Sequence, residues 1–171
     1  PGLPGFTGAS GKNLLDTSKP EFDEEFLAFF EEYLSVTESG GDLRASRFAL
    51  SGTRGKGFFE FLKQVDEKDS PFIALKGQVT GPITFGTAVK DETDKDIFYN
   101  DQLKDAAIKK LALNARWQAL EFSKRGAVPI IFIDEPALAG FGTSVYITIT
   151  KEDVVQSIEE IILEIHAEKG L

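Results

Sequence analysis

The run IIFIDEP at residues 130–136 constrains the fold of this chain most strongly. Four consecutive apolar residues are typical of a strand buried on both faces, as in a parallel sheet. Two carboxylates follow directly, and Pro136 then ends the strand because proline has no amide hydrogen to donate. We therefore expect Asp134 and Glu135 at the carboxyl end of a buried strand, the edge at which α/β proteins carry out their chemistry.

The composition indicates one globular domain with a sizeable core. The chain has 171 residues, of which 42% are hydrophobic and 27% charged, which is ordinary for a soluble protein. No apolar run approaches the roughly 20 residues that a membrane span needs, and we expect no signal peptide in these residues, because they lack its basic start and apolar centre. The net charge of −9 argues against binding to nucleic acid or to an anionic membrane surface. Because the chain has no cysteine, disulfides and thiolate ligands are excluded, and the cytoplasm is the default location.

The pattern of elements predicts alternating strands and helices in the second half of the chain. We expect helices at about 20–34, 53–64, 101–124 and 151–169, and strands at 72–75 and 128–133. Loops are predicted at 35–46, 90–97 and 137–149, with 146–149 briefly extended. The helices are long enough to be crossovers, so the two strands are expected to be parallel and adjacent or nearly so, with helix 101–124 packed across them.

The predicted organisation is a single incomplete domain over residues 1–171. Residues 1–19 are expected to form a loop or arm, residues 20–70 a mainly helical part, and residues 71–171 a βαβα core. The chain opens without an initiating methionine and closes where another strand is expected. We interpret it as a piece of a larger domain.

Four polar residues are candidates for a binding site. Asp134 and Glu135 point to opposite sides if the strand continues through them; each either binds a ligand or makes a helix cap or ion pair, and the pattern leaves both open. Gln78 and Thr80 flank Val79 and point to one side, at the carboxyl end of their own strand. A glutamine there can orient a carboxylate or an amide. Thr80 is alternatively the cap of the next helix.

Two further residues are expected to have no functional role. Lys76 is the other candidate from the strand of Gln78, but we favour its interpretation as a surface lysine whose stem covers apolar neighbours. His166 is the sole histidine, and a single histidine without partners makes neither a metal site nor a triad.

Two segments resemble a known superfamily. Residues 76–86, KGQVTGPITFG, resemble the "GPxT" strand-loop-helix of the cobalamin-independent methionine synthase and uroporphyrinogen decarboxylase superfamily, and residues 132–138, FIDEPAL, resemble the "IDEPAL" motif of methionine synthase barrels. The helix around residues 111–118 is similar to that of small barrel proteins in this superfamily. The resemblance covers about residues 71–171, and the two motifs in this order are more specific than either alone.

The resemblance implies a partial TIM (β/α)8-type barrel with its site at the carboxyl ends of the strands. It implies a methyltransferase that methylates a thiol such as homocysteine, with Asp134 at the substrate amino group and Glu135 in the same loop. A thiol amino acid and a methyl donor are the implied partners. The family's zinc ligands lie on later strands, so no cofactor is expected in this chain and zinc is expected only in the intact protein.

The resemblance leaves two other functions open. One is an enzyme similar to uroporphyrinogen decarboxylase, which uses the same barrel without zinc. The other is a binding domain of this fold without catalysis. In each case an incomplete barrel exposes apolar surface, so we expect another chain, another copy or a rearranged segment to cover the 128–133 strand edge and the apolar stripe of helix 151–169.

Overall fold

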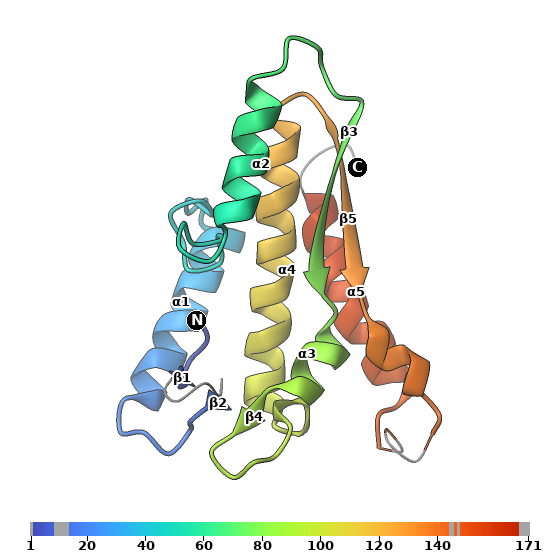
Figure 1. Cartoon of the computed structure of the whole chain (residues 1–171). Helices are drawn as coiled ribbons and strands as arrows, with labels where there is room; N and C mark the ends of the chain where they lie inside the picture. The colour runs from blue at the N-terminus through green and yellow to red at the C-terminus, as the bar shows by residue number, and fades with distance from the viewer. Residues whose placement is uncertain (1, 9–13, 144–145, 147, 168–171) are drawn as a thin grey trace.

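The computed structural model describes residues 2–8, 14–143, 146 and 148–167. Its helices and strands alternate after residue 73 (Figure 1). In chain order the elements are β1 (Phe6–Thr7), β2 (Leu14–Leu15), α1 (Phe22–Glu38), α2 (Lys56–Asp66), β3 (Ala74–Thr80), α3 (Pro82–Ala88), β4 (Lys90–Asp91), η2 (Ile97–Tyr99), α4 (Asp101–Ser123), β5 (Val128–Asp134), η3 (Pro136–Gly140) and α5 (Lys151–Ala167).

Strands β3 and β5 form a parallel pair, which confirms the predicted topology. The register joins Ala74 to Val128 and continues without a break to Thr80 and Asp134. The connection between the two strands contains α3, β4, η2 and α4, and α4 packs across the pair. Gly126, which has a positive φ of 72°, ends the turn after α4 and lets the chain enter β5.

The burial of these strands differs from the prediction. Strand β3 begins two residues later than expected and runs on to Thr80. In β5 the expected burial on both faces is wrong, because Phe132 is 57% exposed and Ile130 is 42% exposed. Both strands alternate between a covered and an uncovered face, so the pair is half-buried. A run of apolar residues does not distinguish these two cases.

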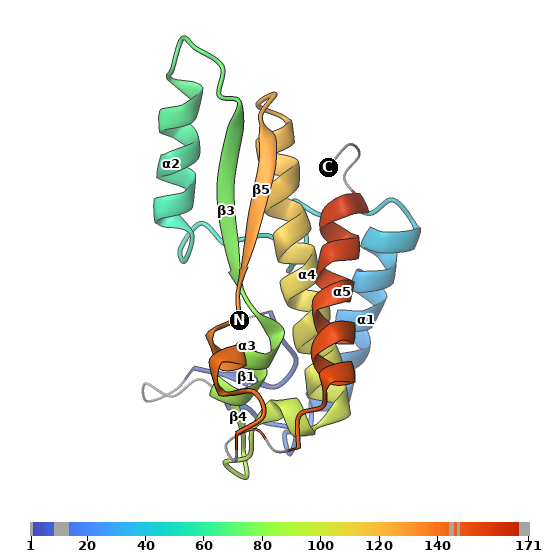
Figure 2. The same cartoon turned by 90° about the vertical axis from the view of Figure 1, so that its right-hand side faces the viewer.

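Helices α4 and α5 lie on the covered face of the β3–β5 pair, as Figure 2 shows. Val79 and Ile133 of the strands pack in one cluster with Ala112 of α4 and Ile161 of α5. Small residues in α4 let the second helix approach closely. Helix α5 starts with a capping box, in which the Thr150 hydroxyl accepts from the backbone amide of Asp153 and the Asp153 carboxylate accepts from that of Thr150.

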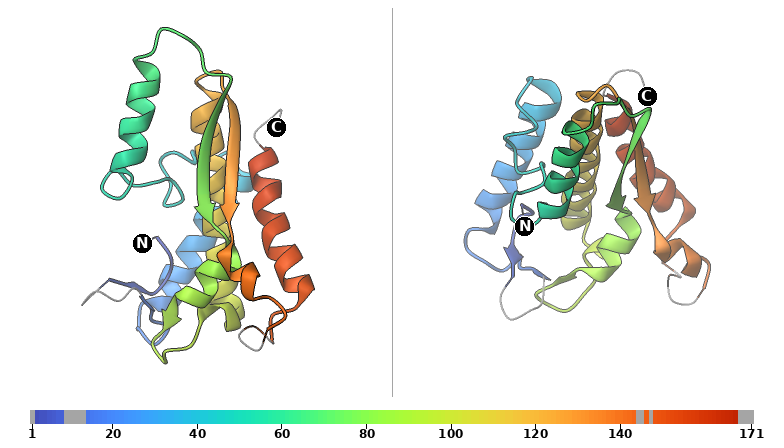
Figure 3. Two further views of the ribbon diagram at one scale, coloured as in Figure 1. Left: turned by 45° about the vertical axis from the view of Figure 1, so that its right-hand side comes forward. Right: turned by 45° about the horizontal axis from the view of Figure 1, so that its top comes forward.

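The other side of α4 carries the main aromatic core. Helix α1 lies along it, and Phe29 of α1, Phe48 of the following loop and Trp117 of α4 are all buried in one cluster. Helix α2 packs near the end of α4, where Phe58 lies 5.2 Å from Trp117 between ring centroids. Figure 3 shows α4 between α1 and α2 on one side and the strand pair and α5 on the other.

Several predicted boundaries and loops need correction. Helix α1 runs to Glu38 because Val36 is still buried in the core, and α2 spans Lys56–Asp66. The predicted arm at residues 1–19 and the predicted loop at residues 90–97 are not wholly irregular, because β2 pairs with β1 and with β4 at residues 90–91. The pairing of β2 with β4 joins residues far apart in the chain, and local sequence patterns do not reveal such contacts. The 137–149 loop begins with η3, and Tyr146 lies in a short helical turn, while Ile147 lies outside the described residues.

The described residues form a mixed α/β fold with two sheets, one in the order β1-β2-β4 and one of β3 and β5. Neither sheet closes on itself within the described ranges. No helix there is both long enough and apolar enough to cross a membrane.

Candidate functional site

The structure brings Gln78, Thr80 and Asp134 together on the uncovered face of the strand pair. Thr80 and Asp134 are register partners at the carboxyl ends of β3 and β5, and Gln78 lies one alternation earlier, opposite Phe132. The side chains of Gln78, Thr80, Asp134 and Phe132 are all exposed. Side chains directly opposite each other on neighbouring strands lie about 5 Å apart at Cβ, so one small ligand can contact all three polar groups.

Asp134 has a free carboxylate. Its side chain is exposed, and within the described ranges no residue bonds to it. Only its backbone is engaged, since the carbonyl accepts from the amide of Gly81 at 2.7 Å. Asp134 therefore does not cap a helix, which was the alternative interpretation of this residue.

Glu135 points the other way and caps helix α3. Its Oε2 accepts from the backbone amide of Ile83 at 2.8 Å and its Oε1 from that of Thr84 at 2.7 Å. The Thr84 hydroxyl also donates to Oε1 and accepts from the amide of Ala137 at 3.0 Å. Helix N-termini leave amides unsatisfied and favour negative charge. This geometry matches the capping alternative for Glu135, and a substrate contact by Glu135 stays a prediction.

Gly81, not Thr80, occupies the cap position of α3, and it has no side chain with which to cap. A Cβ at Gly81 would overlap the Glu135 carboxylate. The glycine thus leaves the space through which a carboxylate from the neighbouring strand reaches the helix. The two sequence motifs form one structural unit, with Gly81 and Thr84 from one and Glu135 from the other.

Lys76 lies on the same open face and contacts two of its neighbours. Its Nζ donates to Oε1 of Gln78 at 2.6 Å and lies 4.6 Å from the ring centroid of Phe132. A cation over an aromatic face is attracted by the ring quadrupole. The lysine therefore orients the Gln78 amide, with its oxygen engaged and its NH2 group available to a ligand.

Gln118 of α4 is a positioning residue that the sequence analysis missed. Its buried side-chain amide accepts from the backbone N–H of Gln78 at 3.2 Å and donates to the carbonyl of Gln78 at 3.0 Å. The backbone N–H and carbonyl of Gln78 both point away from β5. In a parallel pair only every second residue of a strand bonds to the neighbouring strand, and Gln78 is not one of these residues. Gly77 makes room, since a Cβ there would overlap Gln118 Oε1. The sequence feature that could have indicated this role is the position of Gln118 among the alanines and leucines of α4.

The described residues offer no site for a metal. They contain no group of three or more His, Cys, Asp or Glu side chains that could hold an ion. His166 is exposed near the end of α5. The open face is instead suited to hydrogen bonding with a small polar ligand that carries a positive charge, because Asp134 supplies a carboxylate and Gln78 supplies an amide.

Comparisons of the chain with protein-family models, with curated proteins and with solved structures found no match. The class that the structure defines is thus an α/β protein whose parallel strand pair carries a polar cluster at its carboxyl end.

Proposed function

We propose that this chain is a segment of a methionine-synthase-like methyltransferase and that the open face of β3 and β5 is part of the interior of a (β/α)8-type barrel. The observation that carries the proposal is the pairing of Thr80 with Asp134, which puts a free carboxylate and two polar side chains at one strand edge. That is where such barrels bind substrate. The apolar neighbours Ile130 and Phe132 on the same face suit a barrel interior.

In the proposed site, Asp134 binds the ammonium group of a thiol amino acid such as homocysteine through a charge-assisted hydrogen bond. The NH2 group of Gln78 donates to the substrate carboxylate, and Thr80 offers a hydroxyl beside Asp134. In the overall reaction the sulfur loses its proton and bonds to the methyl carbon, while the bond from that carbon to the donor breaks and the demethylated donor keeps the electron pair and takes up one proton. These residues bind and orient the substrate and do not themselves take part in bond making.

Zinc does not fit the residues of this chain. The resemblance implies a zinc ion bound by histidine, cysteine and glutamate, whereas this sequence has one histidine and no cysteine. Thiolate and imidazole are the ligands that zinc prefers. A zinc site in the intact protein would have to come from residues outside this chain, and no step of the proposal depends on it.

The open face of β3 and β5 also exposes several large apolar side chains. Val128, Ile130 and Phe132 of β5 are 44%, 42% and 57% exposed, and Ile73 before β3 is 90% exposed. The outer face of α5 adds Leu163 at 63%. Apolar surface of this extent is rare on monomers, so we propose that another chain or another copy covers it.

Calorimetric titration of the chain with L-homocysteine tests the proposed site. The matched ligand is 4-sulfanylbutanoate, which lacks only the amino group. We expect homocysteine to bind at least about tenfold more tightly, because one charge-assisted hydrogen bond is worth about 1.5–3 kcal/mol. Asp134→Asn should abolish this preference, and Asp69→Asn, at an exposed loop carboxylate, should preserve it. Equal binding of the two ligands would contradict the proposal and favour the decarboxylase-like or non-catalytic alternative.

A further inference from the structure

A cavity of about 610 Å³ lies between the N-terminal segment, the loop before α2 and helices α3 and α4. Its lining contains none of the four candidate residues of the strand edge. Its volume falls within the range of small-molecule sites, roughly 300–1,000 Å³. The walls are mainly apolar, with Leu3, Phe6 and Leu15 on one side and Phe85 and Leu111 on another.

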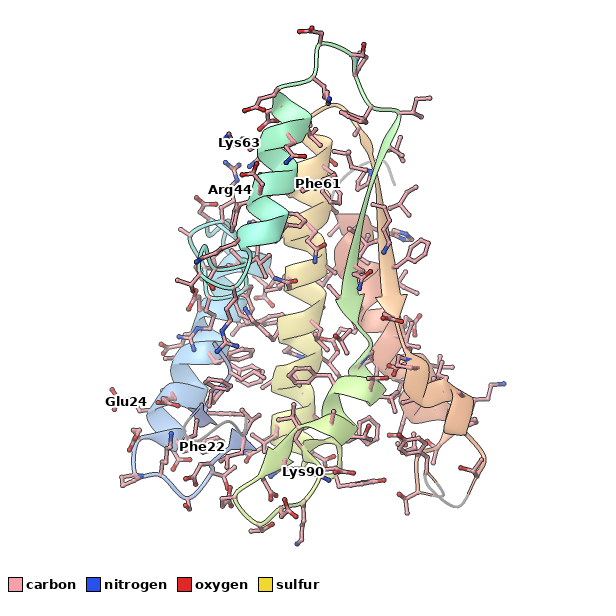
Figure 4. All side chains as sticks on the ribbon, viewed as in Figure 1. Phe22, Glu24, Arg44, Phe61, Lys63 and Lys90 are labelled. Carbon is pink, nitrogen blue, oxygen red and sulfur yellow. The ribbon has the colours of Figure 1, made fainter. Side chains whose placement is uncertain are left out.

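All of the charged residues that line this cavity are basic. They are Arg44, Arg47, Arg54 and Lys110, and among the residues that the structure describes no aspartate or glutamate lines it. This is unexpected in a chain with 28 acidic and 19 basic residues. Figure 4 labels Arg44, which lies in the loop between α1 and α2. An apolar cavity with several basic residues in its lining is suited to a ligand with an apolar body and an anionic head.

Most of this positive charge is not neutralised by the described protein. Arg47 pairs with Glu32, with 2.6 Å between Nε and Oε2. Arg44 and Arg54 have no ion pair within the described ranges, and the guanidinium of Arg54 lies 5.6 Å from the ring centroid of Phe6. Planar guanidinium groups match the two oxygens of a carboxylate. Arg44 and Arg54 are therefore available to pair with such an anion, and Arg54 lies against the apolar ring of Phe6.

Lys110 is partly buried, whereas Arg44 and Arg54 are exposed. Its Nζ donates to the backbone carbonyl of Arg47 and lies 5.7 Å from the ring centroid of Phe48. Burial, and then the positive charge of Arg47, lower the pKa of Lys110 to about 8, against a smaller opposite effect of Glu32. A charged amine without a carboxylate partner is costly in such surroundings. A bound anion would supply the missing partner.

We propose that this cavity binds an amphipathic carboxylate, with the carboxylate between Arg44, Arg54 and Lys110 and an aliphatic or aromatic body against Leu3, Phe6 and Leu111. This site is separate from the strand edge and does not depend on the proposed methyltransferase function. The ligand is an acid of fatty-acid or aryl-acid type, and its length is limited by the volume of the cavity.

Calorimetry of the full chain with octanoate at pH 7, compared with octanamide, tests the proposal without any variant. The two ligands share the same alkyl body, and the amide is uncharged. We expect one octanoate per chain and at least about tenfold weaker binding of octanamide, which corresponds to about 1.4 kcal/mol. No binding of octanoate at millimolar concentration, or equal binding of both ligands, would overturn the proposal.

Variants then locate the site. Arg44→Gln combined with Arg54→Gln should weaken octanoate binding at least about tenfold, which again corresponds to about 1.4 kcal/mol, and should leave octanamide binding unchanged. The control is Lys63→Gln, which removes one positive charge from an exposed position on α2 (Figure 4). Circular dichroism confirms that each variant is folded. If Lys63→Gln weakens binding as much as the double variant, the anion is held by general charge and the proposal is wrong.

Discussion

The backbone amide of Thr84 donates a hydrogen bond of 2.7 Å to the carboxylate of Glu135, although the two residues are 51 positions apart. This contact fixes the end of β5 against the start of α3. It also separates the roles of two adjacent acids, because Glu135 serves the fold while Asp134 remains free on the open face.

Glu135→Gln should lower the free energy of unfolding by about 1–3 kcal/mol, because a neutral amide accepts fewer and weaker bonds from the amides of Ile83 and Thr84. Urea denaturation measures the change. The matched control is Glu152→Gln, at an exposed position in the first turn of α5, and it should change stability by less than about 0.5 kcal/mol. An equal effect of both substitutions would show that the cap is energetically unimportant.

Gly81→Ala should be destabilising because the new methyl group overlaps the Glu135 carboxylate. The penalty should become smaller in a Glu135→Ala background, where most of the overlapping atoms are gone. A double-mutant cycle in urea measures this coupling, and we expect about 1 kcal/mol or more. Additive effects of the two substitutions would contradict the close approach of Gly81 and Glu135.

Lys110→Met should raise the free energy of unfolding by about 1–2 kcal/mol at pH 7, because it removes a poorly paired buried charge. In the parent protein the pKa of Lys110 is lowered to about 8 in the folded state. The unfolded state therefore binds the proton more tightly, and the stability of the parent rises as the pH increases from 8 towards 10.5. The advantage of Lys110→Met should shrink over this interval. Denaturation at pH 7, 8.5 and 10 measures it, and a constant difference would refute the role of burial.

We expect the chain to associate through the open strand face. Phe132 is 57% exposed there, and Phe132→Ser removes most of its apolar surface. We expect the parent chain to form assemblies in multi-angle light scattering and the variant to be mainly monomeric. Glu159→Ser, at an exposed position on α5, is the control and should leave association unchanged. A monomeric parent at high concentration would show that this face needs no cover.

The sequence was sufficient to predict the parallel strands, the crossover helix and the edge where Gln78, Thr80 and Asp134 meet. Hydrophobic periodicity carries this information because each helix or strand packs one face against its neighbours. The sequence does not show whether one face or both faces of β5 are covered, since an apolar run fits either a buried or a half-buried strand. The capping role of Glu135 and the contact of Gln118 with Gln78 link residues about 50 and 40 positions apart. No local pattern specifies such pairs.

The most direct test of the division between Asp134 and Glu135 measures stability and L-homocysteine binding for the same two variants, Asp134→Asn and Glu135→Gln. We predict that Asp134→Asn weakens binding about tenfold or more and changes the free energy of unfolding by less than about 0.5 kcal/mol. Glu135→Gln should lower that free energy by about 1–3 kcal/mol and leave binding by the folded protein nearly unchanged. The opposite pattern, with a stability loss in Asp134→Asn and intact binding, would contradict the assignment of these two acids.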